Sequence, residues 1–104
     1  MWAPVDLDGL FKALADPTRR AILDGLAERN GQTLFEICVR LTMRHGADMS
    51  RQAVTKHLDV LEDAGLIRTA REGRSKFHYL DERPVVSAYD DWLRPHVTRG
   101  RRHR

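Results

Sequence analysis

The sequence predicts a mainly α-helical domain with one small β-hairpin, an α+β fold of the winged helix-turn-helix type with about five helices and a two-stranded wing. Two observations carry this prediction. Residues 50–64 have the spacing of an amphipathic helix with one polar face, and the segment that follows, residues 66–80, has the pattern of a basic hairpin. The hairpin therefore follows directly on the amphipathic helix in the chain.

The first half of the chain predicts three helices. The first helix carries apolar side chains at helical spacing: Leu7, Leu10, Phe11 and Leu14. The second begins with Asp16 as its N-cap and Pro17 in its first turn, and Asn30-Gly31 ends it. The third spans about residues 34–41. Residues 42–49 exceed the turn of a minimal helix-turn-helix, so either the third helix continues or a loop bulges there.

The helix over residues 50–64 has both of its ends marked in the sequence. Ser50 suits the N-cap position, and Gly65 suits the left-handed residue that ends a helix. One arc of this helix is apolar: Ala53, Val54, His57, Leu58, Val60, Leu61 and Ala64. The opposite arc holds Arg51, Gln52, Thr55, Lys56 and Asp59. Arginine, glutamine and threonine are suited to the edges of DNA bases, but a polar arc alone is also typical of a solvated helix face.

The next segment favours the nucleic-acid interpretation. Residues 66–70 and 76–80 predict two short strands around a turn that contains Gly73. Against the single acid Glu72, the hairpin carries four basic side chains: Arg68, Arg71, Arg74 and Lys76. A net charge of +3 in one hairpin is unfavourable unless an anion balances it. We therefore expect these side chains to contact DNA together with Ser50, Arg51, Gln52, Thr55, Lys56 and His78.

A last helix is predicted after the hairpin, with Pro84 in its first turn. We expect this helix to bury one side, formed by Val85, Val86, Tyr89, Trp92 and Leu93. The aromatic side chains among them either close the hydrophobic core of one chain or form additional apolar surface outside that core. Together with Trp2 and Phe11, they give the two terminal helices more apolar surface than one small core requires.

Length and composition fit a single domain over residues 1–97. The formal net charge is +3, divided into −1 for residues 1–49 and +4 for residues 50–104, so the basic excess accompanies the predicted DNA-binding elements. We expect residues 98–104 to be a disordered basic tail. Its arginines either add phosphate affinity or form a solubilising or expression-derived end.

Several classes of protein are disfavoured by what the sequence contains. A single cysteine excludes an intrachain disulfide, and the sequence has neither a signal-peptide pattern nor an apolar run approaching ~18 residues. We therefore expect a cytoplasmic protein with no membrane contact. No nucleophile–base order, glycine-rich phosphate loop or paired-carboxylate motif is present, so we expect no enzymatic activity.

Three segments resemble the arsenic-repressor (ArsR) family of winged-helix regulators: ALADPTRRAIL at residues 13–23, SRQAVTKHLDVLEDAGLI at residues 50–67 and REGRSKFHYL at residues 71–80. The resemblance extends over about residues 7–93. It implies a bacterial homodimeric repressor that binds a palindromic operator and is released by an effector. The inducer stays unknown from the sequence. In the family the terminal helices form the dimer interface, which implies these interface residues here: Trp2, Leu7, Leu10, Phe11, Leu14, Tyr89, Trp92 and Leu93.

The resemblance also raises the question of a metal site. Family members that bind arsenic or cadmium use closely spaced cysteines on the third helix, where this chain has Cys38 and then Arg40, which cannot ligate a metal. The other family site, on the last helix, needs paired carboxylate and histidine ligands across the dimer. Asp90, Asp91 and His96 lack its two-histidine pattern, and Trp92 interrupts the region. We expect no metal and no other cofactor, and Cys38 as a buried structural thiol.

Two alternatives stay open. The first is a winged-helix module that binds an acidic protein partner, for which apolar residues on the exposed recognition face would be the sign. The predicted polar arc has none. The second is a thiol- or metal-responsive repressor that acts through Cys38.

Overall fold

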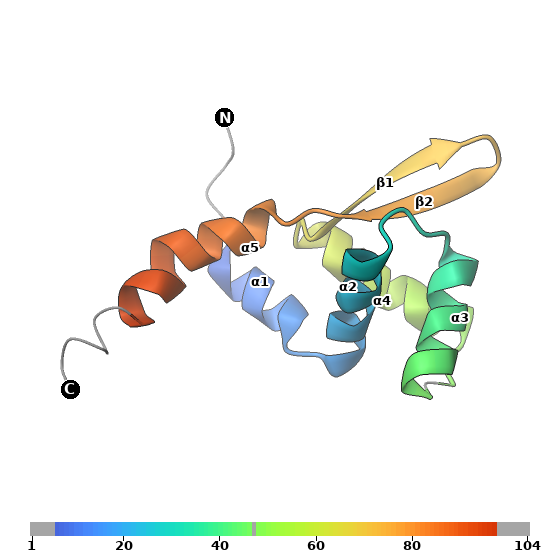
Figure 1. Ribbon diagram of the computed structural model, residues 1–104, viewed down its shortest axis with the longest axis horizontal. Coiled ribbons are helices and arrows are strands. Elements are labelled where there is room, and N and C mark those ends of the chain that lie inside the picture. The colour runs from blue at the N-terminus through green and yellow to red at the C-terminus, as the bar shows by residue number, and fades with distance from the viewer. Residues whose placement is uncertain (1–5, 47, 98–104) are drawn as a thin grey trace.

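The structure confirms the predicted fold class: a body of helices from which one hairpin projects (Figure 1). The computed structural model describes residues 6–46 and 48–97. In this part of the chain the α-helices are α1 (Leu7–Leu14), α2 (Pro17–Glu28), α3 (Leu34–His45), α4 (Arg51–Asp63) and α5 (Arg83–Ala88). The antiparallel hairpin consists of β1 (Ile67–Glu72) and β2 (Ser75–Leu80). After α5, a π-helical turn, η1 (Tyr89–Leu93), leads into helical backbone as far as Val97.

Local capping explains where α2 and α3 begin. The Asp16 carboxylate accepts hydrogen bonds from the backbone N–H groups of Thr18 (2.8 Å) and Arg19 (3.1 Å). Partial burial raises the pKa of Asp16, but these hydrogen bonds and the nearby basic side chains together hold the pKa below its usual value. At α3, Thr33 and Glu36 form a reciprocal capping box. The hydrogen bond from the Thr33 backbone N–H lowers the pKa of Glu36.

The connection between α3 and α4 resolves one open alternative. Helix α3 continues to His45 rather than ending near residue 41, and Gly46 ends it with a left-handed φ of 61°. Both predicted ends of the next helix are confirmed. The Ser50 hydroxyl accepts a hydrogen bond from the Ala53 N–H (3.1 Å), and Gly65 has a φ of 77°.

The five helices, β1 and the residue before it supply one core: Leu10, Ala13, Ile22, Leu26, Ile37, Leu41, Val54, Leu58, Leu61, Leu66, Ile67 and Ala88. Val60 belongs to the predicted apolar arc, but its side chain is exposed. At 3.6 residues per turn, Val60 lies about 120° around α4 from Val54, at the margin of the apolar arc.

The last helix also differs from its prediction. It buries Pro84 and Ala88, whereas four of the five side chains predicted to be buried are exposed: Val85, Val86, Tyr89 and Trp92. The reason is that α5 packs against α1, while η1 extends beyond the helical body at the end opposite the hairpin (Figure 1), where the Phe11 ring of α1 contacts Trp92 at its edge. Within one chain, the surplus apolar surface of the terminal helices is therefore left uncovered.

The hairpin strands are longer at the tip than predicted. Glu72 pairs with Ser75, so the turn consists of Gly73 and Arg74 alone. Gly73 has a φ of 61° and no other residue of the turn has a positive φ, which is the pattern of a type II′ turn. Leu66 lies outside β1, because its N–H donates instead to the Leu61 carbonyl (2.9 Å) at the end of α4.

A buried pair of residues, Gln32 and His78, attaches the hairpin to the helices. Their backbones exchange two hydrogen bonds, of 3.1 and 2.7 Å. The His78 Nδ1 also lies 2.9 Å from the Gln32 carbonyl oxygen and donates to it, since a carbonyl only accepts. The Gln32 side-chain amide donates to the carbonyls of Gly25 (3.0 Å) and Arg29 (2.7 Å). The expectation that His78 contacts DNA phosphate is wrong, because the residue is only 5% exposed.

The loop before α3 holds the same strand at two further points. The Asn30 side-chain oxygen accepts a hydrogen bond from the Leu80 N–H (2.8 Å). Gly31 has a φ of 76°, and a Cβ there would lie 2.9 Å from Cε1 of Tyr79. The Asn30-Gly31 pair, which the sequence marks as a helix end, therefore also contacts strand β2 at Leu80 and Tyr79.

We expect Gly31→Ala to lower the free energy of unfolding more than Gly46→Ala does. Both positions have a positive φ, which costs a non-glycine residue roughly 1–2 kcal/mol. Only Gly31 also meets a close neighbour, since no atom lies within 4 Å of the Cβ position at Gly46. Urea denaturation of both variants measures the difference. Equal losses would contradict the close packing of Gly31 against Tyr79.

We expect His78→Phe to lower the free energy of unfolding by about 1 kcal/mol, because it removes a buried hydrogen bond. Its affinity for random DNA should stay unchanged at every salt concentration. Lys76→Ala, in the same strand but at an exposed position, should lower the affinity for random DNA and leave the free energy of unfolding unchanged. Urea denaturation and fluorescence anisotropy with labelled DNA measure both quantities. A loss of DNA affinity in a stably folded His78→Phe protein would contradict the structural role.

Candidate nucleic-acid interface

The N-terminal half of α4 presents polar side chains to solvent. Each residue of the predicted polar arc is exposed: Arg51, Gln52, Thr55, Lys56 and Asp59. The N-terminus of a helix carries partial positive charge. The acids of α4 (Asp59, Glu62 and Asp63) lie in its second half, so basic side chains and the helix dipole act together at the first turns. This end of α4 is suited to approach phosphate.

Two arginines of the candidate interface lie over aromatic rings. The Arg51 guanidinium carbon is 5.7 Å from the centroid of Phe35 in α3, and that of Arg68 is 4.7 Å from the centroid of Tyr79. Arg68 also contributes to the lowered pKa of Asp81, after the larger effect of the hydrogen bonds from Arg83. Arg68 is thus held at the base of the hairpin, away from its tip. Sequence reasoning did not identify Phe35, because helical spacing alone does not show which element faces it.

The tip of the hairpin concentrates positive charge. Arg71 and Lys76 lie directly opposite one another in the strand register, and Arg74 lies in the turn between the strands. All three are exposed. Like charges at directly opposed positions destabilise a hairpin. A phosphate backbone against this tip would remove that repulsion.

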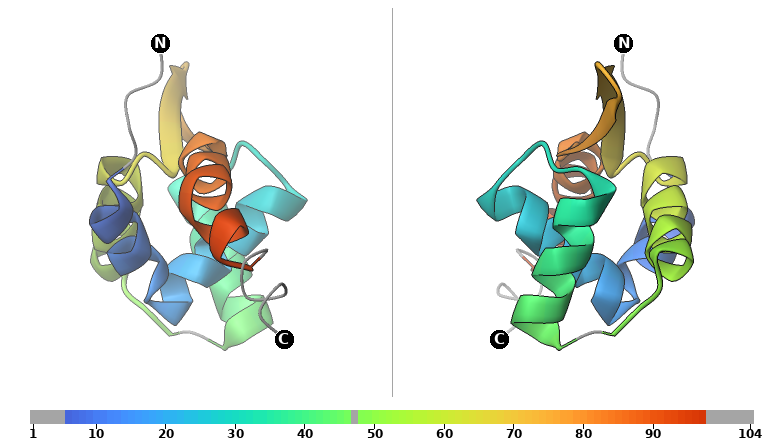
Figure 2. Two further views of the ribbon diagram at one scale, coloured as in Figure 1. Left: turned by 90° about the vertical axis from the view of Figure 1, so that its left-hand side faces the viewer. Right: turned by 90° about the vertical axis from the view of Figure 1, so that its right-hand side faces the viewer.

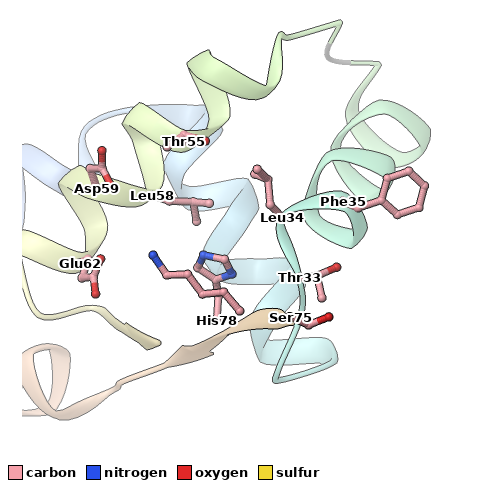
Figure 3. A pocket seen from close by; sticks show the side chains of 10 residues that line it. Thr33, Leu34, Phe35, Thr55, Leu58, Asp59, Glu62, Ser75 and His78 are labelled. Atoms are coloured by element: carbon pink, nitrogen blue, oxygen red, sulfur yellow. The ribbon is translucent and has the colours of Figure 1, made fainter. Parts of the chain in front are cut away.

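A groove of about 290 Å³ lies between the start of α3, α4 and strand β2 (Figure 3). Leu34 from α3 and Leu58 from α4 project into it near His78 (Figure 3). Thr55 lines the groove on the α4 side and Lys76 on the β2 side. Two predicted DNA-binding residues from separate elements therefore border one concave surface.

Arg19 fixes α4 relative to the first two helices. Its guanidinium donates to the carbonyls of Ala13 (2.7 Å) and Lys12 (3.0 Å) at the end of α1. A third guanidinium nitrogen lies 3.2 Å from Nδ1 of His57 in α4, which accepts because arginine only donates. His57 is half-buried, as expected of a packed histidine. Sequence reasoning missed the role of Arg19, which joins residues far apart in the chain.

A second exposed surface lies on the terminal helices. The Phe11 and Trp92 rings meet edge to face with centroids 6.2 Å apart, and Tyr89, Val85 and Val86 are exposed beside them in sequence. Among the other predicted interface residues, Leu7, Leu14 and Leu93 are half-buried. The prediction that Leu10 belongs to the dimer interface is wrong, because this residue lies in the core of its own chain. Trp2 and the basic tail lie outside the described residues.

The described residues contain no group of three or more His, Cys, Asp and Glu side chains that could hold a metal ion. Cys38 is half-buried and packs against the core. Arg40 donates to the Glu28 carboxylate (2.7 Å). Asp90 pairs with Arg94 at 3.7 Å, and the ring of His96 stacks on Trp92. Within the described part of the chain, no helix has both the length and the apolar composition needed to cross a membrane.

The chain matches known proteins over most of its length. A helix-turn-helix domain family matches residues 14–70. The uncharacterized HTH-type transcriptional regulator YuzN of Bacillus subtilis strain 168 is 44% identical over 86 residues, covering 83% of this chain and 94% of the relative. The transcriptional repressor SdpR of the same strain is 28% identical over 90% of this chain and 96% of the relative. The crystal structure of an ArsR family transcriptional regulator matches with a TM-score of 0.72 at 36% identity, over 88% of this chain and 87% of the other. The chain therefore belongs to the ArsR family of winged helix-turn-helix regulators, which bind DNA and are not enzymes.

Proposed function

We propose that this regulator is a homodimer that represses transcription by binding an operator with an inverted repeat. The exposed apolar side chains of α1, α5 and η1 support the dimer, since a small domain rarely leaves so many large side chains to water on neighbouring elements. A repressor among its relatives supports repression as the outcome of binding.

Within each subunit we assign different roles to α4 and the hairpin. Arg51, Gln52, Thr55 and Lys56 enter or flank the major groove, because α4 presents them at its free N-terminal half. Arg71, Arg74 and Lys76 hold the phosphate backbone. The observation that carries this proposal is the opposition of Arg71 and Lys76 in the strand register, which an anion would stabilise.

A two-fold axis through the apolar surface would relate two copies of α4. In dimers of helix-turn-helix proteins, the recognition helices enter successive major grooves about 34 Å apart. The corresponding operator has two half-sites of opposite direction separated by one helical turn.

We expect Gln52→Ala to change the sequence preference, and Arg74→Ala to weaken binding to all sequences and reduce the salt slope by about one. The glutamine side chain is suited to a base edge, whereas an arginine in the turn reaches the backbone. Fluorescence anisotropy with the upstream region of the regulator's own gene and with a scrambled fragment separates the two effects.

Equal losses on both fragments in both variants would refute this division of roles. Wild-type protein with no preference for the upstream fragment over the scrambled one would count against specific binding there.

We expect Trp92→Asp to dissociate the dimer, because the new carboxylate would lie in the apolar surface between subunits. Met43→Asp, a change at an exposed residue of α3, is the matched control and should remain dimeric. Analytical ultracentrifugation measures the oligomeric state, and circular dichroism confirms folding. A folded Trp92→Asp protein that stays dimeric would exclude this surface as the interface.

A further inference from the structure

One face of α3 is apolar and exposed although the opposite face already packs into the core. Phe35, Val39 and Met43 recur every four residues and are 61%, 38% and 80% exposed. They form a stripe about 12 Å long, which we call the α3 stripe. A groove of about 440 Å³ along it is also lined by polar side chains: Arg29, Gln32, Glu36, Arg40 and Arg44. Since Ile37 and Leu41 supply the core-facing side of α3, the α3 stripe has no neighbour inside the domain to bury it.

The proposed function leaves most of this stripe unexplained. The DNA-contacting side chains come from α4 and the hairpin, and the apolar dimer surface comes from α1, α5 and η1. Helix α3 lies at the other end of the molecule from η1 (Figures 1 and 2). Val39 and Met43 therefore belong to neither surface.

The charges around the α3 stripe are unequal. Arg40 and Arg44 both bind the single Glu28 carboxylate, at 2.7 and 2.5 Å. Arg29 pairs with Glu36 at 3.2 Å. Arg51 lies over the Phe35 ring at the N-terminal end of the stripe. Four guanidinium groups thus surround the stripe with two carboxylates, a surplus of two positive charges. An apolar centre with basic flanks is complementary to an acidic amphipathic helix.

We propose that the α3 stripe binds an acidic amphipathic helix of a partner protein. Its apolar side chains would occupy the groove beside Val39 and Met43, and its carboxylates would pair with the surrounding arginines. A second copy of the same face is disfavoured, because it would bring the same positive surplus. The ends of the chain are disfavoured as well, because residues 98–104 carry four arginines and residues 1–5 carry no acid.

Docking on the α3 stripe competes with DNA for Arg51. The Arg51 guanidinium lies 5.7 Å from the Phe35 ring centroid, so a helix that covers Phe35 and pairs with Arg51 occupies a group assigned to the DNA interface. This competition rests on the proposed function, whereas the docking itself does not. A partner of this chemistry would release the operator.

The test uses the full chain and a fluorescent helical peptide of about 18 residues, long enough to be marginally helical alone. Leucines at alternating spacings of three and four form one face, glutamates flank them, and a scrambled peptide of equal composition is the control. We expect the wild type to bind the patterned peptide and not the scrambled one. Val39→Asp should weaken this binding about tenfold or more, because it places a charge in the apolar contact. Val60→Asp is the matched control, since this valine of α4 is 40% exposed.

Equal binding of the two peptides, or full binding by a folded Val39→Asp protein, would overturn the docking site. In a second arm, the patterned peptide is added to the protein bound to labelled operator DNA. We expect release of the DNA from the wild type and retention by Val39→Asp. A complex that retains both peptide and DNA would overturn the competition. Failure of the wild type to prefer operator DNA would count against the proposed function, while the direct peptide measurement would still decide the docking site.

Discussion

The pairing of Gln32 with His78 is the constraint on which the position of the hairpin depends. A two-stranded hairpin alone is at best marginally stable in water, so its direction has to come from contacts at its base. Here the backbone of β2 hydrogen-bonds to the loop before α3, and both side chains of the pair are buried and hydrogen-bonded. The attachment places Lys76 across a groove from Thr55 of α4. Buried hydrogen bonds therefore hold the hairpin against the loop before α3 and the end of α2.

Charge is arranged unfavourably for an isolated protein and favourably for a DNA complex. The hairpin places cations opposite one another, and α4 keeps its acids near its C-terminus, where they oppose the helix dipole. Both features cost stability in the free chain. Both are explained if phosphates approach the N-terminal half of α4 and the hairpin tip, and are kept from the C-terminal half of α4. Folding and binding thus place opposite demands on the same side chains.

Local signals predicted the ends of α4 and the start of α2, because Ser50, Gly65 and Pro17 act within a few residues of their own positions. Contacts between distant segments were not predictable in this way. Its place in a basic hairpin predicts a DNA contact for His78, whereas its burial depends on a residue 46 positions earlier. The prediction of Leu10 as a residue of the dimer surface fails for a related reason. A 3.6-residue apolar period is the same whether a side chain faces its own core or another subunit.

The contacts of Arg19 have a consequence for the length of the operator. One guanidinium joins carbonyls at the end of α1 to the middle of α4, so the helix that carries Phe11 and the helix that we propose enters DNA are held together without a flexible joint. In the proposed dimer, the separation of the two α4 helices is then fixed by how the subunits meet. Each base pair added between the half-sites increases their separation by about 3.4 Å and also rotates one half-site about the DNA axis relative to the other. Operators of altered spacing are thereby rejected by geometry, even when every base of both half-sites is correct.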